Sequence, residues 1–146
     1  MDYGFPTDSG QTQFAAINSG DGDMRDHESA MRVYVQLAVI SDRKKQPQVR
    51  DRFLLLAGVE ACRAGWLDVA ECCHHKLIAS NPAHQAHLFA SLADGLRDAN
   101  FQQLVAHWER YCPFEKAEAM LRQLNLPVRE QTDLTVGEQM LDLLNG

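Results

Sequence analysis

The feature that most constrains the fold is a pair of apolar segments of helical length, separated by a glycine. The first, Phe53-Leu-Leu-Leu-Ala-Gly-Val-Glu-Ala-Cys-Arg-Ala, ends at Gly65, and glycine is the residue that most often terminates a helix in the left-handed conformation. The second runs from Trp66 to Ser80 and stops before Asn81 and Pro82. Because the connection is so short, we expect the two helices to pack antiparallel as a hairpin.

Periodic apolar residues predict further helices on both sides of this hairpin. Residues 26–41 fit a helix, although the alternation of Val33, Val35, Leu37 and Val39 would also fit a strand. Helix is favoured because no second strand is visible to pair with it. A connector that contains Pro47 is expected over residues 43–48.

The second half of the chain carries several helix-capping signals. Asn81 and Pro82 suit the start of a helix over 83–98, and Asn100 suits the cap of a helix over 101–111. Pro113 is expected to open a helix that ends near Leu124. Thr135 and Glu138 have the spacing of a capping box in front of a C-terminal helix. The predicted fold class is therefore all-α, with antiparallel helical hairpins stacked as a short solenoid or a helical bundle.

Charge is distributed unevenly along the 146 residues, whose net charge is −6. Residues 1–29 contain six acidic side chains and one basic side chain, Arg25. Residues 1–24 also lack apolar periodicity, so we predict a flexible acidic tail over 1–24 and a single helical domain over 25–146. The only basic cluster is Arg43-Lys44-Lys45, which is too sparse for the basic stripe of a nucleic-acid-binding protein.

No apolar run approaches the roughly 20 residues that a membrane-spanning helix needs. The first residues also lack the basic and apolar regions of a secretory signal. We therefore expect no membrane association, a cytoplasmic location, and free thiols at Cys62, Cys72, Cys73 and Cys112.

Small residues, a helix stop and a proline follow one another across the hairpin at defined spacings. Gly65 lies seven positions after Gly58, Ala70 five positions after Gly65, and Pro82 twelve positions after Ala70. Over residues 51–84 this set resembles the tetratricopeptide repeat, a unit of about 34 residues. A weaker second unit is expected at 85–118, where Leu92 replaces the small residue and Pro113 comes three residues early.

The resemblance implies a protein-binding scaffold whose first helices line a groove for a peptide or helix of a partner protein. In that register, six residues would contact the partner. The arginines would hold carboxylates through paired hydrogen bonds, and the apolar residues would supply buried contact. These six residues are Arg52, Leu55, Val59, Arg63, Phe89 and Arg97.

The segment Cys72-Cys73-His74-His75 raises an alternative function, a metal-binding or thiol-based sensor. Cys72 and His75 share one helical face, and thiolates with imidazoles are the ligands that zinc prefers. The spacing matches no paired metal-binding framework, however, and His74 occupies an internal position of the repeat. No metal and no cofactor are predicted.

The motifs of common catalytic sites are absent from the sequence: there is no GxSxG, HExxH, GxxxxGK[ST] or GxGxxG. Phe101, Trp66 and Trp108 are expected in the core. The predicted function is a non-enzymatic adaptor that binds a peptide or helix of another protein. A structural subunit of a larger assembly remains a further alternative. The apolar stripe around Met140 and Leu144 is expected to be a terminal cap of the domain, and a contact in a homodimer is the alternative.

Overall fold

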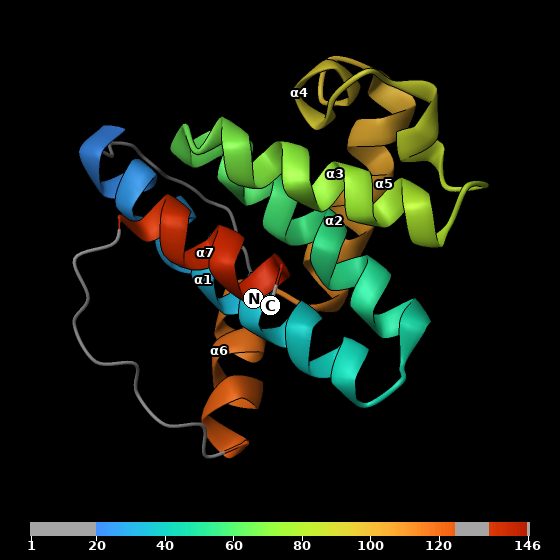
Figure 1. Ribbon diagram of the computed structural model, residues 1–146. Helices are drawn as coiled ribbons and strands as arrows, with labels where there is room; N and C mark the ends of the chain where they lie inside the picture. The colour runs from blue at the N-terminus through green and yellow to red at the C-terminus, as the bar shows by residue number, and fades with distance from the viewer. Residues whose placement is uncertain (1–19, 125–134, 146) are drawn as a thin grey trace.

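A computed structural model describes residues 20–124 and 135–145, with side chains from residue 27 onward (Figure 1). These residues form α-helices joined by short turns, and no strand occurs among them. The elements are α1 (Gly20–Arg43), α2 (Pro47–Ala64), α3 (Leu67–Ser80), the 3₁₀ helix η2 (Gln85–Leu88), α4 (Leu92–Gly95), α5 (Ala99–Tyr111), α6 (Phe114–Gln123) and α7 (Val136–Asn145). The all-α fold class is confirmed.

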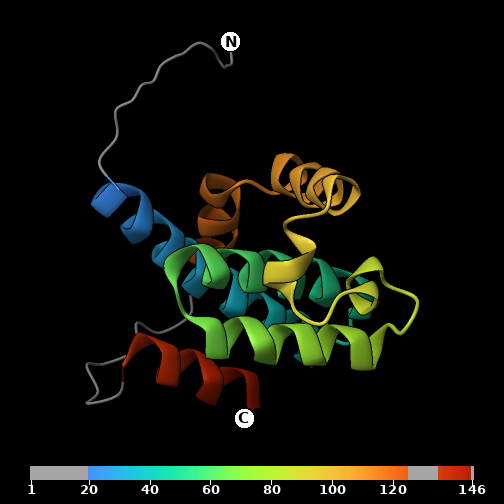
Figure 2. The same cartoon turned by 90° about the horizontal axis from the view of Figure 1, so that it is seen from above.

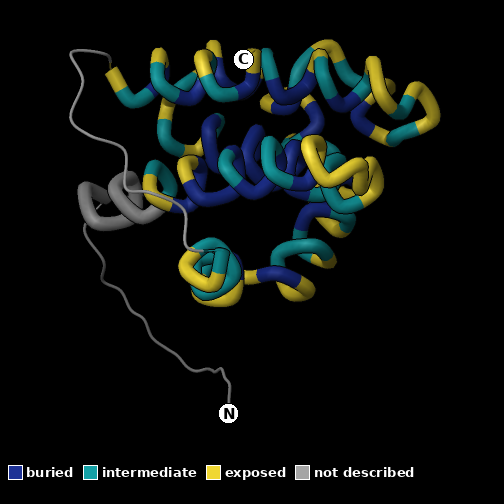
Figure 3. Tube along the Cα trace, turned by 60° about the horizontal axis from the view of Figure 1, so that its bottom comes forward, coloured by how far each residue is buried: buried dark blue, intermediate teal, exposed yellow. Residues whose placement is uncertain are grey.

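Helix α2 lies at the centre of the fold. Nine consecutive residues, Phe53 to Ala61, are buried, so this part of α2 is covered on every side. It packs against α1 and α3 along its length and also contacts α4 and α5. Figure 2 shows α3 and α7 on one side of the molecule and α5 and α6 on the other, and Figure 3 shows the buried stretch running through the middle. The other helices are therefore arranged around a single central one.

The predicted hairpin is confirmed as α2 and α3. Gly65 follows α2 with φ +87°, the left-handed conformation that glycine adopts without steric cost, and its N–H bonds to Cys62 O. Gly58 lies where α2 meets its neighbours. A Cβ atom placed there would collide with Leu92 and would come 3.1 Å from Cys73 Cβ. The small residue at this position is what allows α2 to approach α3 and α4 so closely.

The predicted connector over residues 43–48 is wrong at its C-terminal end. Pro47 is the first residue of α2 rather than part of a connector, because a proline at the first helical position loses no intrahelical hydrogen bond. Residues 26–41 are helical, which settles the choice between helix and strand. Most of the predicted tail lies outside the described residues, but its last five residues, 20–24, already belong to α1.

The helix predicted over 83–98 is also wrong. In its place the chain forms η2 and the four-residue α4, each started by a side chain that caps the backbone. His84 Nδ1 accepts from the N–H of Ala86 at 3.0 Å, and Ser91 Oγ accepts from the N–H of Asp94 at 3.1 Å. These local bonds compete with a continuous helix. The predicted second repeat unit, 85–118, therefore lacks the long first helix that the resemblance implied.

The remaining helices form where the sequence predicts them, except that a different residue caps α5. Asp98, not Asn100, caps α5 by accepting from the N–H of Phe101 at 3.0 Å. Pro113 precedes α6 as expected. The capping box is confirmed: Thr135 Oγ1 accepts from the N–H of Glu138 at 3.1 Å, and Glu138 Oε1 accepts from the N–H of Thr135 at 2.9 Å. It starts α7, which then contacts α1 and α3.

Candidate functional site

The six residues predicted to line a groove do not share one surface. Leu55 and Val59 are completely buried, with 0% of their surface exposed, and belong to the hydrophobic core. The repeat register had placed them on an open face of the first helix. In the structure that helix is the central α2, which is surrounded by its neighbours, so neither residue offers surface to a partner.

Arg63 is occupied by carboxylates of the protein itself. Its Nη1 forms ion pairs with Glu60, at 3.0 Å, and with Glu109 on α5. Glu60 is only 7% exposed and also pairs with the Nδ1 atom of His27 on α1. This cluster links α1, α2 and α5, so the Arg63 guanidinium neutralises a buried carboxylate rather than facing an open groove.

Arg97 and Phe89 are also not placed as the repeat implied. Arg97 is exposed in the turn after α4, and its N–H bonds to the carbonyl oxygen of Asp94. Phe89 is half-buried and packs on Phe101, with ring centres 5.3 Å apart. Arg63 and Arg97 are therefore not equivalent members of a helical stack, and the predicted pair of carboxylate-binding arginines is not formed between matching helices.

Arg52 is the predicted residue that does border a cavity. Its guanidinium carbon lies 4.6 Å from the ring centre of Trp108 and 5.6 Å from that of Tyr111, both on α5. The two aromatic rings meet edge to face with centres 5.7 Å apart. Lys116 on α6 completes the group: its Nζ atom lies 5.1 Å from the Tyr111 ring and donates to the Tyr111 carbonyl at 3.3 Å. Cations over aromatic faces are held by the quadrupole of the ring.

These residues surround a cavity of about 220 Å³, which we call the aromatic pocket. It lies where α2, α5 and α6 meet. Its apolar walls come from Phe53, Leu56, Trp108, Tyr111 and Met120, and its cations are Arg52 and Lys116. Neither cation forms an ion pair with a residue in the described part of the chain. The pocket thus combines an apolar interior with two positive charges.

Sequence reasoning missed most of this pocket. Trp108 was expected in the core together with Phe101, and Phe101 is indeed fully buried, whereas Trp108 is only half-buried. A signal was present in the spacing of Trp108 and Tyr111, which lie three residues apart and so share one face of a helix. Lys116 and Met120 reach these two rings because the chain turns at Pro113. The direction of that turn cannot be predicted from the sequence.

The Cys72–His75 segment does not assemble into a metal site. Cys73 and His74 are buried, and His74 Nε2 lies 2.9 Å from the carbonyl oxygen of Ala86. Among residues 27–124 and 135–145, no group of three or more potential ligands is placed to hold a metal ion. The predicted internal position of His74 is confirmed.

The four thiols are free, as expected, and burial shapes their chemistry. Desolvation raises the pKa of Cys62, Cys72, Cys73 and Cys112 above the ordinary cysteine value. A raised pKa means less thiolate at neutral pH, and the thiolate is the reactive form. Burial therefore lowers the fraction of each of these thiols that is ionised at neutral pH.

The described residues define an all-helical protein with a central buried helix and a peripheral aromatic pocket. Comparisons of the chain with protein families, with curated proteins and with solved structures find no match. Within the described residues, no helix combines the length and the apolar character required to cross a bilayer.

Proposed function

We propose that this chain is a non-enzymatic protein-binding module, and that the aromatic pocket receives one apolar side chain of the partner next to a carboxylate. The observation that supports the proposal is the stack of Arg52, Trp108 and Tyr111 beside an apolar cavity. The resemblance to tetratricopeptide repeats over residues 51–84 points to the same function class.

The residue types at this pocket favour a protein partner. Trp, Tyr and Arg dominate the energetically important positions of protein interfaces, and Met is enriched there as well. Tyr111 is 57% exposed although it is a large aromatic residue. A volume of about 220 Å³ is suited to one large side chain rather than to a drug-sized ligand, for which pockets of about 300–1,000 Å³ are usual.

The two cations of the aromatic pocket indicate which group of the partner lies next to its apolar side chain. Arg52 and Lys116 lie over aromatic faces and keep hydrogen-bonding capacity that ring contacts do not use. A carboxylate of the partner would meet both charges, and charge-assisted hydrogen bonds of this kind are about twice as strong as neutral ones. The expected partner segment is therefore an apolar residue adjacent to Asp or Glu.

Selection of peptides from a random library against the wild-type protein tests this function. The expected peptides share an apolar residue beside an acidic one, and Tyr111→Ala weakens their binding by tenfold or more. Lys116→Gln reduces the preference for the acidic residue.

Leu88→Ala supplies the matched control, because Leu88 is 78% exposed and lines neither cavity. Binding by this variant should equal that of the wild type. Peptides without an acidic residue, or equal losses in Tyr111→Ala and Leu88→Ala at unchanged helicity, would contradict the proposal.

A further inference from the structure

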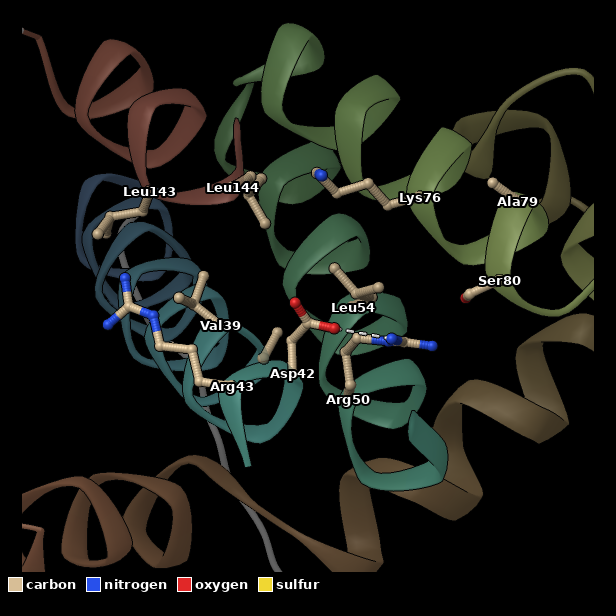
Figure 4. Close-up of a pocket in the computed structure, with 11 residues that line it drawn as sticks. Val39, Asp42, Arg43, Arg50, Leu54, Lys76, Ala79, Ser80, Leu143 and Leu144 are labelled. Carbon is tan, nitrogen blue, oxygen red and sulfur yellow. Dashed lines mark hydrogen bonds and ion pairs between the residues drawn. The ribbon is translucent and has the colours of Figure 1, made fainter. Parts of the chain in front are cut away.

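A second and larger cavity lies on the opposite side of α2. It has a volume of about 440 Å³ and is enclosed by residues of α1, α2, α3 and α7 (Figure 4). We call it the cationic cleft. Its volume falls within the range of about 300–1,000 Å³ that is usual for small-molecule sites, unlike that of the aromatic pocket.

One part of the lining of the cationic cleft is apolar. Val39 of α1, Leu54 of α2, and Leu143 and Leu144 of α7 supply aliphatic surface from three helices. Leu54 and Leu144 are buried, whereas Val39 and Leu143 are partly exposed. Figure 4 shows these side chains around one central space between α1, α2 and α7. An aliphatic chain or a ring placed there would exchange water contacts for apolar ones.

Three cations border this apolar space, each from a different helix. Arg43 belongs to α1, Arg50 to α2 and Lys76 to α3, and the one carboxylate among the lining residues is Asp42. Arg50 is already neutralised, since it donates to Asp42 at 2.8 Å and to Asp51 at 3.2 Å. That pairing leaves Arg43 and Lys76 without an ion pair to any residue that the structure describes.

Among these cations, Lys76 is the one whose position best indicates a site for an anion. It lies within α3, before its last turn, so the helix dipole does not account for its presence as it does for Arg43 at the end of α1. Figure 4 shows its side chain extending toward Leu144, so that the ammonium group lies at the apolar space. A lysine beside aliphatic side chains, without a described carboxylate, is arranged to receive an anion.

We propose that the cationic cleft binds a small amphipathic carboxylate: its apolar part lies against Leu54 and Leu144, and its carboxylate accepts from Lys76 Nζ. Arg43 contributes positive charge at the same opening, and the Asp42–Arg50 ion pair forms one wall. The inference does not rest on the proposed function, because no residue lines both cavities.

Three probes of nearly equal shape and different charge test the proposal: 4-phenylbutyrate, 4-phenylbutanol and 4-phenylbutylamine. We expect the carboxylate to bind the full-length protein about tenfold or more tightly than the alcohol, with no binding of the amine. Amide chemical shifts in a ¹⁵N-labelled sample should change around Leu54 and Leu144, and raised salt should weaken binding of the carboxylate alone.

Two variants and a matched control identify the site. Lys76→Gln should lower the affinity for 4-phenylbutyrate at least fivefold, to a value close to that for the alcohol. Ala79→Trp, at an exposed residue that borders the cleft, should weaken both ligands without loss of helicity. Lys44→Gln removes the same charge at an exposed residue that lines neither cavity and should leave binding unchanged.

Several results would overturn the assignment. They are equal affinities of the acid and the alcohol, no binding of the acid, shift changes centred on Trp108, or an equal loss in Lys76→Gln and Lys44→Gln. Because peptide binding is tested through Tyr111 and ligand binding through Lys76, failure of one proposal is distinguishable from failure of the other.

Discussion

At the scale of single residues, Glu60 lies at the centre of an ion-pair cluster that joins three helices. Its side chain is buried in α2, yet it pairs with His27 of α1 and with Arg63, which in turn pairs with Glu109 of α5. A buried carboxylate is costly unless it is paired and hydrogen-bonded. The Glu60 cluster therefore stabilises the fold through the partners that it keeps in place, chiefly Arg63.

Because Arg63 pairs with the buried Glu60 and Arg97 does not, removing the two side chains should change the free energy of unfolding by different amounts. We expect Arg63→Ala to lower the free energy of unfolding by about 1–2 kcal/mol, because Glu60 then loses a partner while Arg63 itself is partly exposed. Arg97→Ala should stay within about 0.5 kcal/mol of wild type, as is usual for an exposed side chain. Urea unfolding followed by circular dichroism measures both. Equal effects of the two variants would contradict the role assigned to Arg63.

The Glu60 cluster also shows which contacts of a single residue can be predicted from the sequence. The pair Glu60–Arg63 is three residues apart on one helix and could be found from spacing alone. Glu109 lies 46 residues from Arg63, and nothing local indicates that their helices meet. For the same reason Leu55 and Val59 looked like groove residues: α2 is also contacted by α4 and α5, which follow much later in the sequence.

At the scale of elements, helix ends with strong local signals were predicted well. Gly65 and the Thr135–Glu138 box act through bonds within a few residues, so their geometry is independent of the rest of the fold. The region 83–98 failed because its apolar residues fit a helix while His84 and Ser91 form competing local bonds. Capping residues inside an apolar pattern are therefore signs of a broken helix.

The capping box leads to a prediction about α7. Thr135→Ala removes the acceptor for the Glu138 N–H and weakens the start of the helix, so amides of α7 should exchange with solvent several-fold faster than in wild type. Hydrogen exchange read by NMR measures this directly. Ser91→Ala, which removes the equivalent cap of α4, should leave the α7 amides unchanged.

If Thr135→Ala also leaves the α7 amides unchanged, the docking of α7 on α1 and α3 determines its stability rather than its cap. An increase in exchange, in contrast, should be accompanied by weaker binding of 4-phenylbutyrate, because Leu143 and Leu144 supply part of the cationic cleft.

At the scale of the whole molecule, both cavities arise from the way several helices meet around α2. The aromatic pocket draws on α2, α5 and α6, and the cationic cleft on α1, α2, α3 and α7. The positions of most helices could be predicted from the sequence, but the places where these helices meet to form the cavities could not. Arg52 is the only predicted site residue that lines either cavity, and its aromatic neighbours lie more than fifty residues further along the chain.

The buried thiols and Tyr34 predict a loss of stability at alkaline pH. Desolvation by burial raises the pKa of Cys62, Cys72, Cys73, Cys112 and Tyr34 in the folded protein, so the folded state keeps protons that the unfolded chain releases. Stability from these groups is fully present below the unfolded cysteine pKa of about 8.5 and falls as pH rises above it.

Thermal unfolding measured between pH 7 and 10 checks this expectation. The melting temperature should decline progressively above pH 8.5, and Cys73→Ala should make the decline less steep, because that buried thiol no longer titrates. A melting temperature that stays constant up to pH 10 would show that the thiols are not protected in the way that their burial indicates.

The contact of α7 with α1 and α3 has a consequence for synthesis of the protein. Because the chain leaves the ribosome from its N-terminus, α1, α2 and α3 can begin to pack while α7 is still being made. Until then, the surface that α7 covers on α1 and α3 faces the solvent, and the cationic cleft lacks the wall that Leu143 and Leu144 form. The cleft is therefore completed late, and a nascent chain that stalls before Val136 presents an open apolar face to chaperones and proteases.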